Sequence, residues 1–280
     1  DSSDPWQSEK CLKTVVAFWG SGGFFPEVLL KPWSRGGVFY WKSIWVAAAI
    51  ASLITIPILY NLLKVERTPK TASNASEAVG RLESRHWTRN QVLTHWLFWL
   101  YFPSIMSIAM WGTALFFQQV HLTSTKGWTL LQFTSLIPIY TCSTILSMMV
   151  YGWAIDRYGT NKLLSLYQVP MVLSFFLFGV SDSIFVAGLA FVLFGITHGA
   201  NSTIPGAFWA ENFGTKHLGS IKAMATAVSV LGSALGPAIS GILIDFNIPF
   251  STQMPFIAVF IIVCCFLNWF AVKKISRIYH

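Results

Sequence analysis

The sequence predicts an all-α bundle of membrane-spanning helices. Of its 280 residues, 54% are hydrophobic and only 11% are charged, whereas soluble domains carry about 25% charged residues. The apolar residues gather in runs long enough to cross a hydrocarbon layer of roughly 30 Å at 1.5 Å per helical residue. The charged residues lie mainly between those runs. We therefore expect a polytopic membrane protein that has the lipid bilayer as a partner.

The first part of the chain divides into three segments. Residues 1–40 read as an irregular N-terminal segment, in which several glycines and a proline interrupt an apolar stretch and leave a partial helix at most. Residues 41–63 form the first complete span, with Pro57 expected to kink it. Residues 64–92 are a basic linker whose polar composition is typical of a solvent-exposed loop.

A second set of apolar runs follows the linker and extends over residues 93–272. Short polar turns separate these runs, so consecutive helices should be antiparallel neighbours. A basic tail, residues 273–280, ends the chain. The expected spans are residues 93–120, 128–155, 163–180, 184–210, 220–244 and 254–272.

Positive charge gives the spans an orientation. If the 64–92 linker is cytoplasmic, the loops on its side and the tail hold most of the remaining Lys and Arg, whereas the opposite loops hold little more than Lys126. This asymmetry follows the positive-inside rule. We expect a plasma membrane or bacterial inner membrane protein with a cytoplasmic C-terminus. Topology also explains the net charge of +8, and nucleic acid is not an expected partner.

A charged turn joins two of the predicted spans with the spacing G-x-x-x-D-R-x-G-x-x-K, formed by Gly152, Asp156, Arg157, Gly159 and Lys162. The first glycine allows a neighbouring backbone to approach closely, and the second can adopt the positive φ that ends a helix. The three charged side chains hold the turn at the water interface. An ordinary polar hairpin would show the same charges.

This spacing resembles the signature loop of the major facilitator superfamily of secondary transporters, in which the loop recurs between the second and third helices of each six-helix half. Thr160 and Asn161 depart from the family pattern, which has basic residues there. The linker and the six spans after it look like the central loop and C-terminal half of a twelve-helix member, with residues 41–63 as its sixth helix. Residues 113–121 and 208–219 are similar to the monocarboxylate and oxalate/formate branches.

The resemblance implies a substrate cavity lined by the 93–120 and 184–210 spans. His198, Asn201 and Ser202 fall on one stripe of the latter, with His198 near mid-membrane. An imidazole titrates near neutral pH, so His198 could bind substrate or carry a proton. It could equally be a histidine hydrogen-bonded to a neighbouring helix. The other cavity candidates, which also suit packing or inter-helix hydrogen bonding, are Thr113, Gln118, Tyr140 and Thr144.

Small residues mark two helices for close packing. The 220–244 span contains a G-x-x-x-G spacing and a proline, which favour close approach and a bend. Its packing residues are Gly232, Gly236, Pro237 and Gly241. The 184–210 span carries a similar stripe formed by Gly195, Gly199, Ser202 and Gly206.

The resemblance implies secondary active transport of a small solute by alternating access, together with an N-terminal six-helix half that is missing from this chain. Lys222, in the first turn of its span, can extend to the interface, and no Lys or Arg stands at mid-depth. A dianion would need a buried cation, so either the missing half supplies that cation or the solute is an organic monoanion or a less charged molecule.

Two other functional classes stay open. A partial chain could be a truncated membrane scaffold without transport activity. A membrane-embedded enzyme would have to use His86, His95, His121, His198 or Glu211, but the sequence shows no HExxH motif, no paired intramembrane carboxylates and no serine elbow. We therefore expect no enzyme activity, no catalytic residues, no cofactor and no metal site.

Overall fold

The computed structural model describes residues 46, 49–50, 53–57, 80, 82 and 85–278. The chain separates into two compact units, residues 1–76 and residues 77–280. In the first unit the described residues are helical and lie within the span predicted at residues 41–63. The segment 1–40 and most of the linker lie outside the described residues, so these predictions stay open.

The second unit is a helical bundle, and its described residues contain no strand. Six of its helices are long and apolar enough to cross a membrane, which confirms the predicted all-α membrane bundle. Two spans are each divided into a short and a longer helix. The helices are α4 (Arg89–Thr94), α5 (Trp96–Phe117), α6 (Gln119–Lys126), α7 (Leu130–Thr134), α8 (Ile137–Tyr158), α9 (Thr160–Leu164), α10 (Val169–Val180), α11 (Ile184–Phe213), α12 (Leu218–Asp245) and α13 (Phe250–Ile278).

Local sequence signals set the ends of these helices. Gly127, Gly159 and Gly214 have φ values of 68°, 79° and 84° and follow the last residues of α6, α8 and α11. A residue with a Cβ is disfavoured in that conformation. Thr129 caps α7 through a hydrogen bond from Gln132 N at 3.2 Å. The positive φ predicted at Gly159 is therefore present.

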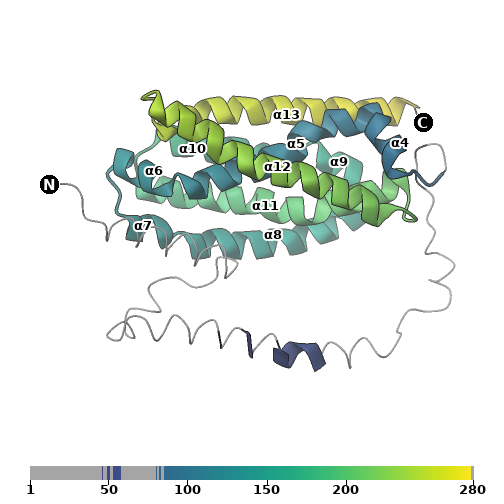
Figure 1. Ribbon diagram of the computed structural model, residues 1–280, viewed down its shortest axis with the longest axis horizontal. Helices are drawn as coiled ribbons and strands as arrows, with labels where there is room; N and C mark the ends of the chain where they lie inside the picture. The colour runs from purple at the N-terminus through teal and green to yellow at the C-terminus, as the bar shows by residue number, and fades with distance from the viewer. Residues whose placement is uncertain are drawn as a thin grey trace. The chain divides into compact units, whose positions relative to one another are not determined.

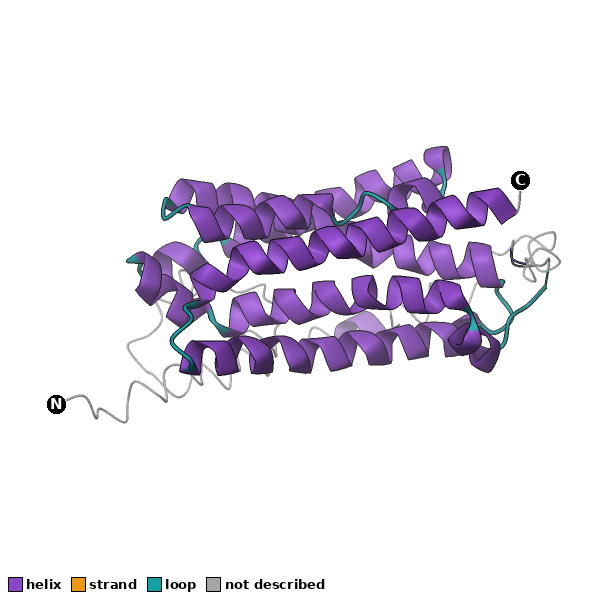
Figure 2. Cartoon of the chain, turned by 90° about the horizontal axis from the view of Figure 1, so that it is seen from above, coloured by secondary structure: helices purple, strands orange, loops and turns teal. Residues whose placement is uncertain are grey.

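The six long helices lie side by side along a common direction (Figures 1 and 2). The largest interfaces join α8 to α11 and α5 to α12, while α10 packs against α11 and α13. One end of the bundle carries α4, α9 and the C-terminus, and the opposite end carries α6 and α7 (Figure 1). We call the first of these the basic end, because it holds Arg157, Lys162, Lys273, Lys274 and Arg277.

The two main interfaces are built on small residues. A Cβ added to Gly195 on α11 would lie 2.6 Å from the Tyr140 carbonyl oxygen on α8. At Gly232 on α12 it would lie 2.7 Å from the Met106 carbonyl oxygen on α5, and at Gly236 it would collide with the carbonyl oxygen of Met110. Real Cβ atoms do not approach so closely, so these positions require glycine. Each pair of helices is consequently in near backbone contact.

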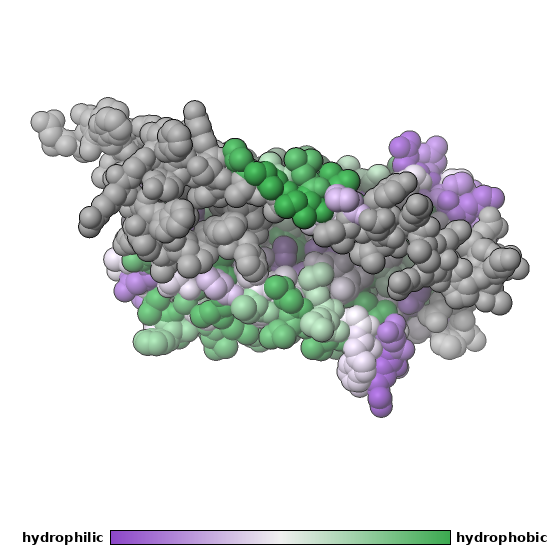
Figure 3. Space-filling view, turned by 90° about the horizontal axis from the view of Figure 1, so that it is seen from below, coloured by the Kyte–Doolittle hydropathy of each residue, from purple (hydrophilic) through white to green (hydrophobic). Residues whose placement is uncertain are grey.

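The surface of the bundle is apolar over its length. Met149, Phe185 and Phe256 are 71%, 87% and 72% exposed, which would be unfavourable in water but suits a hydrocarbon environment. Among the coloured atoms of Figure 3, hydrophobic side chains form much of the lower part of this face, and the most hydrophilic groups lie toward its right-hand end. At the end opposite the basic one, Lys126 forms an ion pair of 2.8 Å with Asp182. The charge asymmetry therefore persists in the folded bundle.

The end of the linker packs onto the bundle, contrary to the exposure expected from its composition. Leu82 and Trp87 are buried, and the Trp87 backbone N–H donates to the Phe213 carbonyl oxygen at 3.0 Å. The Trp87 indole N–H donates to the Leu82 carbonyl oxygen at 2.9 Å. The prediction was wrong for these residues because two apolar side chains within a polar stretch find a site at the end of α11.

Candidate functional site

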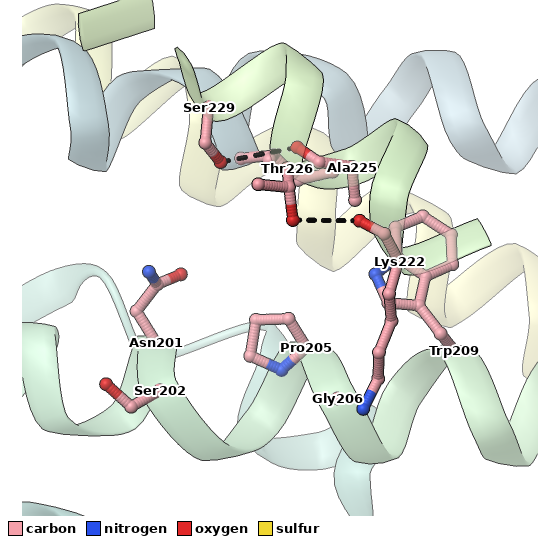
Figure 4. A pocket seen from close by; sticks show the side chains of 10 residues that line it. Asn201, Ser202, Pro205, Gly206, Trp209, Lys222, Ala225, Thr226 and Ser229 are labelled. Atoms are coloured by element: carbon pink, nitrogen blue, oxygen red, sulfur yellow. Dashed lines mark hydrogen bonds between the residues drawn. The ribbon is translucent and has the colours of Figure 1, made fainter. Parts of the chain in front are cut away.

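A cavity of about 270 Å³ lies between α11 and α12. Side chains from both helices reach into the space between them (Figure 4), and α5 closes one side. The lining residues are Ile105 on α5, Asn201, Ser202, Pro205, Gly206 and Trp209 on α11, and Lys222, Ala225, Thr226 and Ser229 on α12.

The cavity exists because the glycines that allow close packing on α11 and α12 face other helices, not each other. Gly195 and Gly199 face α8, whereas Gly232 and Gly236 face α5, so α11 and α12 touch each other only sparsely. Pro205 adds a polar group at the cavity, since a proline cannot donate to the carbonyl four residues earlier. The carbonyl of Asn201 thereby loses its intrahelical partner.

Lys222 is the cation of this cavity. A Cβ on Gly206 of α11 would lie 3.4 Å from the Lys222 Nζ atom, so the ammonium group reaches across from α12 and lies against the glycine (Figure 4). Sequence reasoning placed this side chain at the interface and missed its place here. The signal that could have found it is Gly206, a residue without a side chain on the facing helix.

Three hydroxyl groups in the lining donate their protons to their own helices. Ser202 donates to the His198 carbonyl oxygen at 3.1 Å. Thr226 donates to the Lys222 carbonyl oxygen at 2.9 Å, and Ser229 donates to the Ala225 carbonyl oxygen at 3.3 Å. Their oxygens therefore face the cavity as acceptors. The side-chain donors of the lining are the Lys222 ammonium, the Asn201 amide and the Trp209 indole N–H.

The structure separates His198 from the other residues of its predicted stripe. Asn201 and Ser202 line the cavity, but His198 does not. Its ring lies 5.8 Å from the Tyr140 ring and 6.0 Å from the Phe194 ring, centroid to centroid. His198 and Tyr140 are thus members of an aromatic cluster between α8 and α11.

The remaining cavity candidates also lie outside the lining. Gln118, at the end of α5, donates through Nε2 to the Ser240 hydroxyl on α12 at 3.3 Å. Thr113 is half-buried on α5. Thr144 donates to the Tyr140 carbonyl oxygen of its own helix at 2.9 Å. Gln118 accordingly links two helices, and Thr144 bonds within one.

The predicted signature loop lies at the basic end, where α8 meets α9. Asp156 and Arg157 are exposed, and Arg157 lies 5.7 Å from the centre of the Trp153 ring. Asp156 forms no ion pair with any residue that the structure describes. A Cβ on Gly152 would meet nothing within 4 Å, so the close approach predicted there does not occur inside this bundle.

The two residues that depart from the family pattern fasten this loop to α11. The Thr160 hydroxyl donates to the Glu211 carboxylate, and Thr160 is fully buried. The Asn161 side-chain oxygen accepts from the Asn212 amide at 3.4 Å. Neutral side chains therefore make hydrogen bonds here that the sequence alone did not predict.

A buried polar cluster in the core of the bundle was also missed by sequence reasoning. Gln168 on the α9–α10 connection donates to the Ser104 carbonyl oxygen and the Ser107 hydroxyl, both at 3.0 Å. The Ser104 hydroxyl donates to the Asn268 side-chain oxygen at 2.9 Å. The cluster joins α5, α10 and α13 by bonds within the core. No group of three His, Cys, Asp or Glu that could hold a metal occurs among the described residues.

Residues 104–277 match the Major Facilitator Superfamily. The matched segment begins within α5 and ends near the last residue of α13, so it contains both the cavity and the signature loop. No curated protein matches the chain.

Proposed function

Because this chain belongs to the Major Facilitator Superfamily, a family of membrane transporters, we propose that it moves a small solute across a membrane by secondary active transport. The observation that carries this proposal is the cavity between α11 and α12, which combines a cation, polar acceptors and an apolar wall. Transporters of this kind bind their substrates between helices, in cavities screened from lipid.

The packing of the bundle supports alternating access. The α8/α11 and α5/α12 pairs are held by near backbone contact, and such pairs can move as rigid bodies. Asp156 lies in the last turn of α8, where the helix dipole disfavours a negative charge. Since it stabilises neither its helix nor a described ion pair, we propose that it binds a positively charged group of a partner bundle in one transport state.

The partner in this proposal is an N-terminal six-helix bundle. Gly152 supports it, because its surroundings are empty in this bundle although a glycine in a helix is intrinsically unfavourable by about 1 kcal/mol relative to alanine. We place the basic end in the cytoplasm of a plasma or bacterial inner membrane, with the C-terminus on that side.

The proposed solute is an organic monoanion. Among the described lining residues, Lys222 supplies a positive charge and no Asp or Glu opposes it. A single ammonium group can balance one carboxylate but not a dianion. This assignment needs only groups that the cavity contains.

Uptake of radiolabelled organic acids into proteoliposomes tests the proposal. The full chain is reconstituted alone and together with a separately supplied N-terminal bundle, in parent and Asp156→Asn forms. We expect saturable uptake that the substitution reduces by about tenfold or more, as for the loss of a charged hydrogen bond. Absence of uptake in every arrangement would favour the non-transporting scaffold. Equal uptake by the two forms would refute the role of Asp156.

A further inference from the structure

One side of α13 is exposed from the middle of the helix to its C-terminal end. Its residues recur at alternating spacings of four and three, which places them on a single helix face. We call this face the α13 stripe, and its members are Val259, Val263, Phe266, Phe270, Lys273 and Arg277. The four apolar members are 47% to 62% exposed, and both cations are exposed. The opposite face, with Ala271 and Ile275 buried, packs into the bundle, so α13 lies at its edge (Figure 1).

The C-terminal end of this stripe is positive and has no opposing charge on its own helix. Lys274 lies beside Lys273 and Arg277, and α13 contains no Asp or Glu. None of the three cations forms an ion pair with a described residue. Arg277 is in the last turn of α13, but the two lysines precede that turn, so the helix dipole does not account for them. The positive charge at this end of α13 is therefore available to a group outside the bundle.

Two tryptophan rings hold the lysines at the end of the apolar surface. The Lys273 Nζ atom lies 4.6 Å from the centre of the Trp269 ring. The Lys274 Nζ atom lies 4.2 Å from the centre of the Trp96 ring on α5. A cation above an indole ring is attracted by its π electrons, and tryptophan is enriched where hydrocarbon meets water. Both ammonium groups are thus placed at the depth of lipid headgroups.

A ligand that covers this surface must be anionic at one end and apolar at the other. Ammonium and guanidinium groups donate to the oxygens of a phosphate group. Beside the cations, Phe270 and Phe266 begin an exposed apolar path that continues to Val259. Any phospholipid can cover the apolar path. A zwitterionic headgroup brings a cation of its own, however, whereas a headgroup with a net negative charge does not, so the cations favour an anionic lipid.

We propose that the C-terminal end of α13 binds an anionic phospholipid, with its phosphate among Lys273, Lys274 and Arg277 and its acyl chains along the apolar part of the α13 stripe. The inference does not depend on the proposed transport, because it concerns the outer face of the bundle and not the cavity between α11 and α12. It agrees with the orientation proposed above, since anionic lipids are concentrated in the cytoplasmic leaflet.

Native mass spectrometry of the purified full chain in detergent tests the assignment. The probes are phosphatidylglycerol and phosphatidylcholine with identical acyl chains, so that only the headgroups differ. We expect the parent chain to bind phosphatidylglycerol about tenfold or more tightly than phosphatidylcholine. The preference should decrease as the ionic strength rises, because salt screens exposed charges. Glycerol 3-phosphate at the same concentration should not displace the lipid, because it has no acyl chains.

Variants assign the preference to the three cations. Replacing Lys273, Lys274 and Arg277 together by Gln should bring the affinity for phosphatidylglycerol close to that for phosphatidylcholine. Lys274→Gln alone should reduce it about fivefold. Lys216→Gln is the matched control, because Lys216 is an exposed lysine on the α11–α12 turn at the same end of the bundle. The melting temperatures should stay equal to that of the parent chain, since all the replaced side chains are exposed.

Three results would overturn the inference. The first is equal binding of the two lipids by the parent chain. The second is an equal loss of affinity in Lys274→Gln and Lys216→Gln, which would show that only the net charge of this end matters. The third is displacement by glycerol 3-phosphate, which would show a site for a free phosphate. If the triple variant does not fold, the single variants and the salt dependence of the parent chain decide between these results and the expected one.

Discussion

Glycines on two faces of α11 have opposite effects on packing: one face is in close contact with a neighbouring helix, and the other borders an open space. Toward α8, Gly195 and Gly199 admit the neighbouring backbone so closely that a Cβ on Gly195 would lie 2.6 Å from a carbonyl oxygen. Toward α12, Gly206 admits only the end of one flexible side chain, that of Lys222. The first face is a closed seam between two helices. The second borders the cavity (Figure 4).

The difference teaches that the facing helix decides what a glycine does. α8 presents Ser143 and Ser147, whose hydroxyls donate to the carbonyl oxygens of Val192 and Ile196 on α11 at 2.8 Å and 2.7 Å. Such short side chains allow close approach and add inter-helix bonds. α12 presents a long cation instead, and turns its own glycines toward α5. Two tight pairs result, with space left between them.

The largest expected effect comes from breaking a seam. In Gly236→Val the new side chain would collide with the Met110 backbone, which cannot move without separating α5 from α12. We expect a loss of about 3 kcal/mol in unfolding free energy, seen as a lower melting temperature of the purified protein in detergent. Gly219→Val is the control, since a Cβ there meets nothing within 4 Å. Equal melting temperatures for both variants would refute the seam.

A smaller effect is expected where polar bonds, not glycines, close the core. Gln168→Leu removes the two hydrogen bonds that Gln168 donates to Ser104 and Ser107 and the one that it accepts from the Ser104 hydroxyl, all of them buried. We expect a loss of about 2 kcal/mol, measured by thermal unfolding in detergent. Gln132→Leu, at the exposed start of α7, should cost less because water can replace its cap. A larger loss for Gln132→Leu would show that the buried cluster contributes little.

The sequence predicted those parts of the fold that depend on composition and local order. The six spans follow from apolar runs, and the turn at Gly159 follows from a glycine between charged residues. The contacts of Lys222 and Gln168 could not be predicted, because each depends on a side chain from another helix. Such contacts depend on how each helix is rotated about its axis relative to its neighbours. A single sequence gives little information about that rotation.

In the candidate site, too, the positions of residues along one helix could be predicted, whereas contacts between helices could not. Periodicity correctly placed Asn201 and Ser202 on one stripe of a helix that borders a cavity. It also placed His198 there, although Tyr140 and Phe194 surround that ring. Periodicity shows which side chains share one face of a helix. It does not show which positions of that face a neighbouring helix covers. α8 covers the stripe at His198 and is absent from the lining at Asn201.

His198→Phe tests whether His198 only packs between α8 and α11 or also takes part in transport. Phenylalanine keeps an aromatic ring against Tyr140 and Phe194 but removes the imidazole nitrogens. We expect a change of at most about 1 kcal/mol in stability and an uptake rate with an unaltered pH profile, measured in proteoliposomes between pH 5.5 and pH 8 (about the range in which imidazole titrates). A flattened profile would instead give His198 the proton-carrying role.

Gly206→Ala should have the smallest effect on stability, and it tests the comparison directly. The added methyl meets the end of the Lys222 side chain, which can move, rather than a backbone. An alanine in a helix also gains about 1 kcal/mol over glycine, so the melting temperature should stay the same or rise. Uptake of organic acids per folded molecule should nevertheless fall, because the methyl group occupies space in the cavity beside the Lys222 ammonium. Gly236→Ala, the matched change in a seam, should show the reverse: lower stability with unchanged uptake per folded molecule. If both alanine variants lose stability to the same extent, Gly206 is as closely packed as Gly236, and α11 packs tightly against α12 as well as against α8.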